Sequence, residues 1–224
     1  MEQIVAFHEV QQGEHLSGIA LDYGFPDFTP IWNHPQNAEL KQKRENPHVL
    51  LPGDKVFVPD KTAKEYSRPA DNQHTFEVLT KPLFLKLELR REYDDPIANT
   101  PCDLVVDSDT FTLTSDGKGK LQQKISKKAH NASLRIKDKL QLHDSEIPFE
   151  RLLTIRIGDL NPVDQPSGQM ARLANLGYYR GSIDKVDPDE FHSAVEEFQC
   201  ENGLTVDGKI GPLTQAKLKT VHGC

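Results

Sequence analysis

The chain contains no hydrophobic run that approaches the length of a membrane-spanning helix. Its longest apolar stretches, at 49–52 and 83–85, hold only a few residues, whereas a spanning helix needs about 20. The chain also lacks an excess of basic residues, since 27 lysines and arginines are set against 34 acidic residues, for a net charge of −7. We therefore expect no membrane span and no nucleic acid partner, because nucleic-acid binding is typical of a basic surface.

Cysteine is scarce. The 224 residues include only three cysteines, Cys102, Cys200 and Cys224, and no Cys-x-x-Cys pair. An odd number of cysteines without paired spacing indicates reduced thiols and argues against a structural zinc site. The first ten residues lack the basic segment and the apolar core of a secretory signal. We therefore expect a chain that is cytoplasmic as synthesised, without a Sec signal and without a bound metal or cofactor.

Motifs of the common hydrolytic mechanisms are missing as well. A helical zinc-protease motif starting at His8 needs a second histidine at position 12, which is Gln12. There is no Gly-x-Ser-x-Gly and no phosphate-binding glycine loop, and a period-two pattern places Cys102 on the inward side of a strand. Acidic residues are plentiful, so spacing alone leaves a glycoside hydrolase open. Modules of about 60–70 residues offer shallow surfaces rather than deep clefts, and we expect no catalytic residue.

Residues 1–60 combine two strand patterns with helical ones. A short strand is expected at 8–10, and a turn at 51–54 leads into a second strand at 55–59. Between them, apolar residues recur at helical spacing at Leu16, Ile19, Ala20 and Tyr23. Gly24 ends this helix, and further helices are expected near 27–32 and at 38–45.

This order resembles the lysin motif (LysM) domain, a small βααβ module. The matching residues are Val10, Gly13, Glu14, Leu16, Ile19, Ala20, Tyr23, Gly24, Ile31, Asn33, Leu51, Pro52, Gly53, Val56, Val58 and Pro59. The resemblance implies a glycan-binding groove between the first strand–helix loop and the loop before the last strand. The residues that it assigns to this groove are Gly13, Glu14, His15, Leu16, Leu51, Pro52 and Gly53, with Phe25 and Asp27 at the rim. His15 stands where the family usually has threonine, and this change and the insertion at 34–47 favour protein contacts over glycan.

Residues 61–73 are polar and are expected to form a linker to a strand-rich block at 74–160. Leucines alternate with other residues at Leu83, Leu85, Leu87 and Leu89, which is a period of two. Turn signals, such as the one at 115–119, separate further short strands. Short strands at this spacing predict an antiparallel β-sandwich, and the segment 94–104 resembles the transthyretin-like accessory modules of bacterial surface and secretion proteins.

Residues 161–224 carry the most specific pattern, which predicts three helices. The second helix begins at Asp187-Pro188-Asp189-Glu190, where an N-cap is followed by proline at N1 and an acid at N3. Before the third helix the chain reads Asp207-Gly208-Lys209-Ile210-Gly211-Pro212-Leu213-Thr214. This motif in its helical frame resembles the three-helix peptidoglycan-binding domain of bacterial wall-acting proteins, which binds and performs no chemistry itself.

The loops of this domain are expected to provide its wall-binding surface. The candidate residues are Tyr178, Tyr179, Arg180, Asn202, Asp207 and Lys209. The first three follow the glycine that ends the first helix, and we expect them to be exposed. Aromatic faces and polar side chains of this kind are suited to sugar C–H groups and to the polar groups of the wall.

The whole chain is therefore predicted to be a multidomain α+β protein that binds peptidoglycan without catalysis. The order of its modules is similar to that of peptidoglycan-binding proteins associated with type VI secretion and related contractile injection systems. This resemblance implies a spike or effector protein as a partner, and delivery by the spike to the periplasm or to a target cell. The alternative is an adaptor, chaperone or baseplate element whose LysM-like and strand-rich modules bind protein.

Overall fold

The computed structural model describes most of the chain. The described residues are 6–61, 67–75, 80–91, 95–142, 145–182 and 185–224. They form two compact units, each assembled from separate segments of the sequence. The first unit holds Met1–His15, Trp32–Phe57 and Asp159–Cys224, and the second holds Leu16–Ile31 and Val58–Gly158. The expected linker at 61–73 lies partly outside the described residues.

In the first unit, the N-terminal segments are organised around two short strands. Strand β1 (Ala6–Glu9) pairs with β2 (Lys55–Val58). The short helix η1 (Pro35–Asn37) leads into α3 (Ala38–Arg44), where a helix at 38–45 was predicted. Asn37 is buried because its side-chain amide donates to the Phe57 carbonyl and accepts from the Phe57 N–H, both at 2.8 Å. This amide therefore fixes the start of α3 to β2.

The rest of the first unit is a bundle of three helices. These are α4 (Pro166–Asn175), α5 (Pro188–Glu201) and α6 (Pro212–His222), and each begins with proline. Proline suits this position because its missing N–H is not needed there. Asp187 caps α5 as predicted, since its carboxylate accepts from the N–H groups of Asp189 and Glu190. The core of the bundle is formed by Met170, Leu173, Tyr179, Ala194, Val195, Phe198 and Leu218.

The second unit contains two short helices, which are α1 (Leu16–Asp22) and most of α2 (Thr29–Trp32). Gly24 follows α1 with φ of +73°, as expected of a glycine that ends a helix. Two lysines of a later turn contact this segment: Lys128 forms an ion pair with Asp22 at 2.6 Å, and Lys127 donates to the Pro26 carbonyl at 2.6 Å. The helical segment is thereby joined to the strand-rich part of the same unit.

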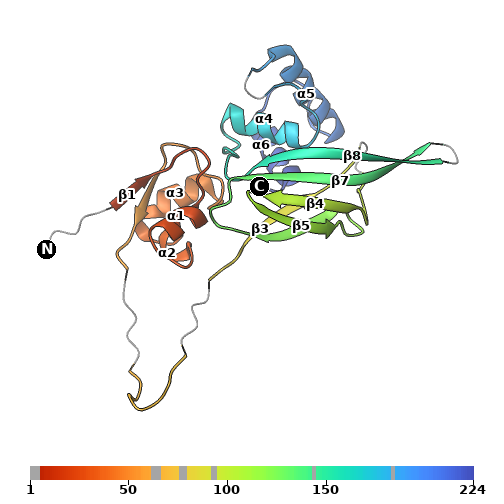
Figure 1. The fold of residues 1–224 in the computed structure, drawn as a ribbon. Coiled ribbons are helices and arrows are strands. Elements are labelled where there is room, and N and C mark those ends of the chain that lie inside the picture. The colour runs from red at the N-terminus through yellow and green to blue at the C-terminus, as the bar shows by residue number, and fades with distance from the viewer. Residues whose placement is uncertain (1–5, 62–66, 76–79, 92–94, 143–144, 183–184) are drawn as a thin grey trace. The chain divides into compact units, whose positions relative to one another are not determined.

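Two antiparallel sheets make up most of the second unit (Figure 1). In the smaller sheet, β3 (Leu83–Glu88) pairs with β6 (Lys120–Ile125). The larger sheet has the order β5-β4-β7-β8, with β4 (Pro101–Val106), β5 (Asp109–Thr114), β7 (Asn131–Leu142) and β8 (Ser145–Arg156). Residues of both sheets share one hydrophobic cluster, in which Cys102 is fully buried, as its strand register predicted.

The predicted α+β class and the helical C-terminal domain are confirmed. The LysM-like fold and the β-sandwich remain predictions, as do the domain boundaries at 60, 73 and 160. Within the described part of the chain, no helix combines the length and the apolar character that crossing a bilayer requires.

Candidate functional site

The turn before α6 is organised by one buried amide, that of Gln199 in α5. Its side chain is 1% exposed. Its Nε2 donates to the Asp207 carboxylate at 2.8 Å, to the Lys209 carbonyl at 2.9 Å and to the Thr214 hydroxyl at 3.2 Å. Its Oε1 accepts from the N–H groups of Asp207 and Gly208, both at 3.0 Å. Four residues of the motif at 207–214 therefore form hydrogen bonds with the side chain of Gln199.

The Asp207 carboxylate stabilises this turn by accepting hydrogen bonds within it. Its Oδ1 also accepts from the Lys209 N–H at 2.9 Å. The hydrogen bond from Gln199 and the one from Lys209 lower the pKa of the Asp207 carboxyl. Gly208 adopts φ of +64°, and a Cβ there would collide with the His192 ring. Aspartate and glycine are thus required at these two positions by the turn itself.

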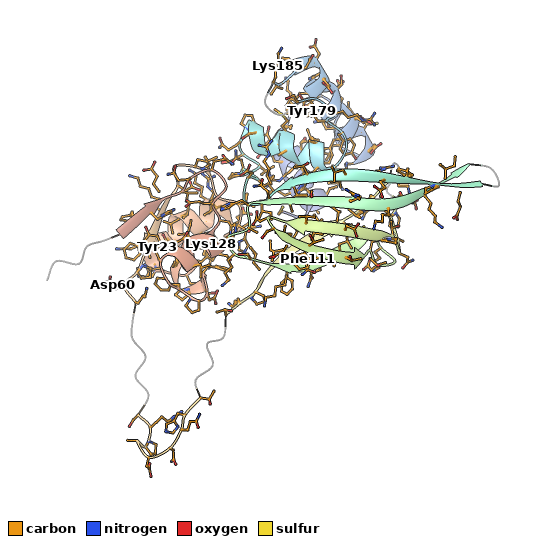
Figure 2. The ribbon with its side chains drawn as sticks, viewed as in Figure 1. Tyr23, Asp60, Phe111, Lys128, Tyr179 and Lys185 are labelled. Atoms are coloured by element: carbon orange, nitrogen blue, oxygen red, sulfur yellow. The ribbon has the colours of Figure 1, made fainter. Side chains whose placement is uncertain are left out.

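The other candidate wall-binding residues divide between surface and core. Tyr178 is partly exposed; its ring meets Phe198 edge-on at 5.3 Å and its hydroxyl donates to Glu201 at 2.7 Å. Tyr179, which Figure 2 labels, is only 3% exposed, and its ring meets that of Phe191 edge-on with the centroids 6.1 Å apart. The expected exposure of Tyr179 is therefore wrong, because the chain turns back toward the bundle core after Tyr178.

Four of the six candidates gather around the last turn of α5. Asn202 ends this helix and donates to the Phe198 carbonyl at 2.9 Å, next to the ring that Tyr178 contacts. Asp207 and Lys209 are held beside the same turn by Gln199. Arg180 is exposed. Tyr178, Asn202, Asp207 and Lys209 therefore lie near one another at one end of the domain, and the role of the six candidates in wall binding stays a prediction.

Two exposed apolar residues beside this turn were not predicted. Leu213, the second residue of α6, is 79% exposed, and Val206 is 50% exposed. They flank the residues that Gln199 holds. The sequence contains a weak signal for both: Leu213 is off the apolar face of its helix, and Val206 is an apolar residue in a polar loop. Hydrophobic periodicity alone does not show what such residues do.

The LysM-like candidates in the first unit lie in two adjacent loops. The Val10 N–H donates to the Asp54 carbonyl and the Gly53 N–H to the Val10 carbonyl, both at 2.9 Å. Glu14 is engaged locally, since its carboxylate lies 2.7 Å from His8 Nε2 and accepts from the Gln11 N–H at 2.8 Å. Its carboxylate therefore stabilises the loop in which it lies.

The remaining LysM-like candidates of this unit differ in exposure. His15 is 5% exposed and its ring meets His48 edge-on at 5.6 Å. Leu51 is half-buried, whereas Pro52 and Gly53 are exposed. The turn that carries them is fixed by Asp54, which accepts from the Leu51 N–H at 2.9 Å and from the Arg44 guanidinium at 2.7 and 2.8 Å. Burial raises the pKa of Asp54, but the hydrogen bonds from Arg44 and Leu51 outweigh it and the net shift is downward.

Three further LysM-like candidates belong to the second unit. Leu16 is fully buried and Phe25 is 9% exposed. The Asp27 carboxylate accepts from Thr29 and forms an ion pair with Lys81 at 2.9 Å. These environments are typical of residues that support a fold, and a role in glycan binding remains a prediction for them.

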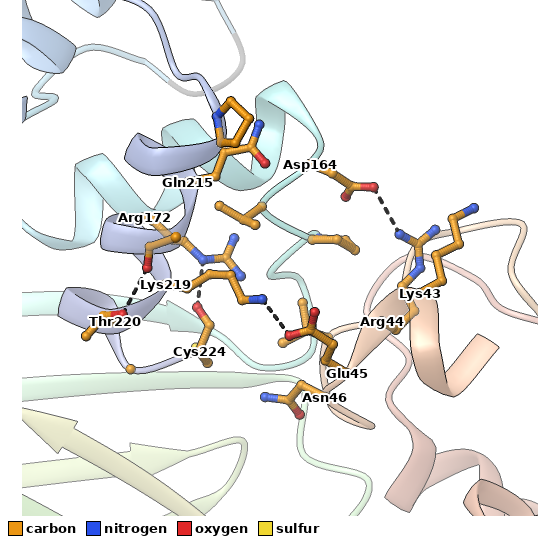
Figure 3. A pocket seen from close by; sticks show the side chains of 16 residues that line it. Lys43, Arg44, Glu45, Asn46, Asp164, Arg172, Gln215, Lys219, Thr220 and Cys224 are labelled. Carbon is orange, nitrogen blue, oxygen red and sulfur yellow. Dashed lines mark hydrogen bonds and ion pairs between the residues drawn. The ribbon is translucent and has the colours of Figure 1, made fainter. Parts of the chain in front are cut away.

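An open groove of about 720 Å³ lies within the first unit (Figure 3). Two ion pairs cross it, from Lys219 to Glu45 at 2.6 Å and from Arg44 to Asp164 at 3.5 Å. Arg172, also in its wall, is 1% exposed and donates to the carbonyl groups of Asn161, Gly168 and Cys224, all at 2.8 Å. Three cations of this groove, Arg44, Arg172 and Lys219, are therefore already engaged with acids and carbonyls of the chain.

A cysteine and a histidine meet at the edge of this groove. Cys224 Sγ lies 3.2 Å from His222 Nδ1, and Asn175 Nδ2 lies 3.0 Å from His222 Nε2. Burial lowers the pKa of His222 to about 4 and raises the pKa of Cys224. Both groups are therefore neutral at pH 7, and the thiolate that nucleophilic catalysis needs is not favoured. Among the residues with described side chains, no three His, Cys, Asp or Glu residues converge as metal ligands would.

The three-helix bundle and its Gln199-centred turn form a small helical module. Residues 171–218, which run from α4 to α6, match the family model of the putative peptidoglycan binding domain. No curated protein and no solved structure gives a significant match to the chain. The C-terminal domain is thus a peptidoglycan-binding domain by its sequence family, which suggests a role in binding the cell wall.

Proposed function

We propose that the chain is a non-catalytic peptidoglycan-binding protein that contacts the wall through the loops around the last turn of α5. The family match over residues 171–218 carries this proposal. The geometry supports it, because Leu213 and Val206 offer exposed apolar surface next to the exposed Lys209. Apolar side chains pack on sugar C–H groups, and an ammonium group binds the carboxylates and carbonyls of peptide stems.

Co-sedimentation of the full chain with purified sacculi tests this proposal. Leu213→Gln is the informative variant and Val221→Gln is its matched control, since Val221 is 41% exposed at the far end of the same helix. Loss of about 1 kcal/mol of apolar contact corresponds to about fivefold weaker retention for Leu213→Gln, with no change for Val221→Gln. Absence of retention by the unmodified chain, or clearing of the sacculi by it, would contradict a non-catalytic binding role.

We further propose that the second unit attaches this wall-binding module to a contractile secretion spike or to its effector cargo. The family match accounts for the C-terminal helices and leaves the strand-rich block without a wall-binding role. Such a chain would be made in the cytoplasm and carried to the wall by its partner. We expect the chain to co-purify with a spike or effector protein. If substitutions in the strand-rich block abolish co-purification and Leu213→Gln does not, the partner contacts the strand-rich block.

An adaptor or baseplate role is the second candidate. It is favoured by the LysM-like residues, because Leu16, His15 and Phe25 are all buried and Glu14 is paired with His8. These side chains offer little apolar surface to a sugar. Glycan retention that is unchanged by Glu14→Gln and lost with Leu213→Gln would assign wall binding to the C-terminal domain alone and leave the LysM-like residues to protein contacts.

A further inference from the structure

Strand β8 is a long outer edge of the larger sheet. It spans 12 residues and is the last strand in the order β5-β4-β7-β8, with no described strand on its far side. Apolar residues are exposed along it, since Leu152 is 66%, Ile147 48% and Leu153 42% exposed. An edge of this length with apolar side chains is a template for pairing with another strand, which monomeric proteins usually block.

The register of β7 and β8 shows which backbone groups face outward. The Ile157 N–H donates to the His130 carbonyl at 2.8 Å, in register with the β7–β8 ladder. Because hydrogen bonding alternates along an antiparallel strand, the odd-numbered residues of β8 bond to β7 and the even-numbered residues face the open edge. The backbone groups of Glu150, Leu152, Thr154 and Arg156 are thus directed away from β7. Pro148 has the same parity, so its missing N–H leaves the β7 ladder intact.

We propose that β8 pairs with β8 of a second copy of this chain, antiparallel and about a two-fold axis at Leu153. In this register Glu150 lies opposite Arg156 of the second copy, and the two-fold repeats the pair. Leu152 lies opposite Thr154 in the same way, and Leu153 faces its own equivalent. The pairs Glu150–Arg156 and Leu152–Thr154 consist of even-numbered residues, whose backbone groups face away from β7. The register that brings these side chains together is therefore also one in which the backbones can form hydrogen bonds.

Opposite charges favour this register. A two-fold at Glu150 would place two carboxylates face to face, and one at Arg151 would place two guanidinium groups face to face, both of which are unfavourable. The register at Leu153 puts opposite charges together twice and no like charges. The ladder of hydrogen bonds between the two copies would end at Pro148, which has no N–H to donate. Glu150 and Arg156 both also interact within the chain. The ion pair of Glu150 with Arg135, at 3.7 Å, joins two side chains that are more than half exposed, and such a pair contributes little.

The pairing would place two C-terminal wall-binding domains in one assembly. Linked binding sites raise apparent affinity without a new contact, provided that both can reach the ligand. The dimer itself does not depend on wall binding, so its test is separate from the test of the proposed function.

Analytical ultracentrifugation of the full chain, from about 1 μM to about 500 μM, measures this association. We expect a monomer–dimer equilibrium. Each of Glu150→Arg and Arg156→Glu replaces two attractive cross-strand pairs with repulsive ones and should raise the dissociation constant about tenfold. The double variant restores both pairs and should return the constant to within about threefold of the original. Lys118→Glu, in an exposed turn away from β8, is the matched charge-reversal control and should change nothing.

Thr154→Pro provides a second test that does not rely on charge. It removes an N–H from the open edge while leaving the odd-numbered bonds to β7, and prolines are tolerated at such positions. Folding of every variant is checked by circular dichroism, and a folded Thr154→Pro variant should be monomeric. A chain that stays monomeric at all concentrations, a dimer indifferent to both charge reversals, or a double variant that fails to restore association would overturn the proposal.

Discussion

Replacing Gln199 with leucine tests whether one buried amide holds the turn before α6. The substitution keeps nearly the same volume and removes every hydrogen bond of the side chain, which has three acceptors for Nε2 and two donors to Oε1. Leucine also has good helix propensity, so α5 itself is not weakened. Any loss of stability therefore reports on the turn that Gln199 organises.

The expected loss is about 2–3 kcal/mol. The two backbone N–H groups of Asp207 and Gly208 lose their acceptor, and an unsatisfied buried donor costs about 1–3 kcal/mol. We take the lower end of the summed cost of the two N–H groups, because Asp207 and Lys209 are exposed and water can replace part of the lost hydrogen bonding. Gln215→Leu is the matched control, since Gln215 makes one long bond to the Ile210 carbonyl at 3.3 Å. It should cost less than about 0.5 kcal/mol.

Amide hydrogen exchange is the suitable assay, because a chain of two units need not unfold in one step. Gln199→Leu should increase exchange across 203–214 and at the start of α6, with the strands of the second unit unchanged. A loss of less than about 0.5 kcal/mol, or equal effects of Gln199→Leu and Gln215→Leu, would refute the conclusion that this amide organises the turn.

Two further predictions concern the same domain. Gly208→Ala should destabilise it by about 1–2 kcal/mol, because φ of +64° is strained for alanine and the new Cβ meets His192. Gly211→Ala should cost only about 0.5 kcal/mol, because Gly211 has φ of −76° and open space around it, and only its place as the N-cap of α6 disfavours alanine. Denaturant unfolding compares the two variants. Burial holds the pKa of His222 at about 4, below its usual 6.5. The stability that the neutral imidazole contributes is fully present above pH 6.5 and is lost as the pH falls to 4. It amounts to at most about 3 kcal/mol. His222→Gln should flatten stability measured across this range.

Local patterns predicted most of the helices and strands. The N-cap and proline at Asp187-Pro188 start α5 where expected, and the alternating leucines of β3 and the inward register of Cys102 are found in the structure. These features depend on neighbours in sequence, through capping and through the period-two alternation of a strand. For such features the sequence is sufficient because the chain makes the same local choice in almost any fold.

The candidate site was less predictable, because exposure depends on residues far away in sequence. Tyr178 and Tyr179 are identical neighbours, yet Tyr178 lies at the surface against Phe198 and Tyr179 is buried against Phe191. The LysM resemblance assigns Glu14 and His15 to a glycan groove, and this role stays a prediction. In the structure, Glu14 lies against His8 and His15 packs on His48. Whether a polar or aromatic side chain faces solvent is decided by such tertiary contacts, which no local pattern contains.

The motif that identifies the domain and the surface that we propose binds the wall are therefore separable. Asp207, Gly208 and Thr214 are required by the Gln199 network, so their presence indicates the fold and says little about affinity. Affinity should depend instead on what the network leaves outside, above all Leu213. Gln199→Leu should accordingly lower both stability and sacculus binding, and Leu213→Gln only binding. Equal stability losses from both substitutions would mean that Leu213 is part of the fold and that the wall contacts another surface.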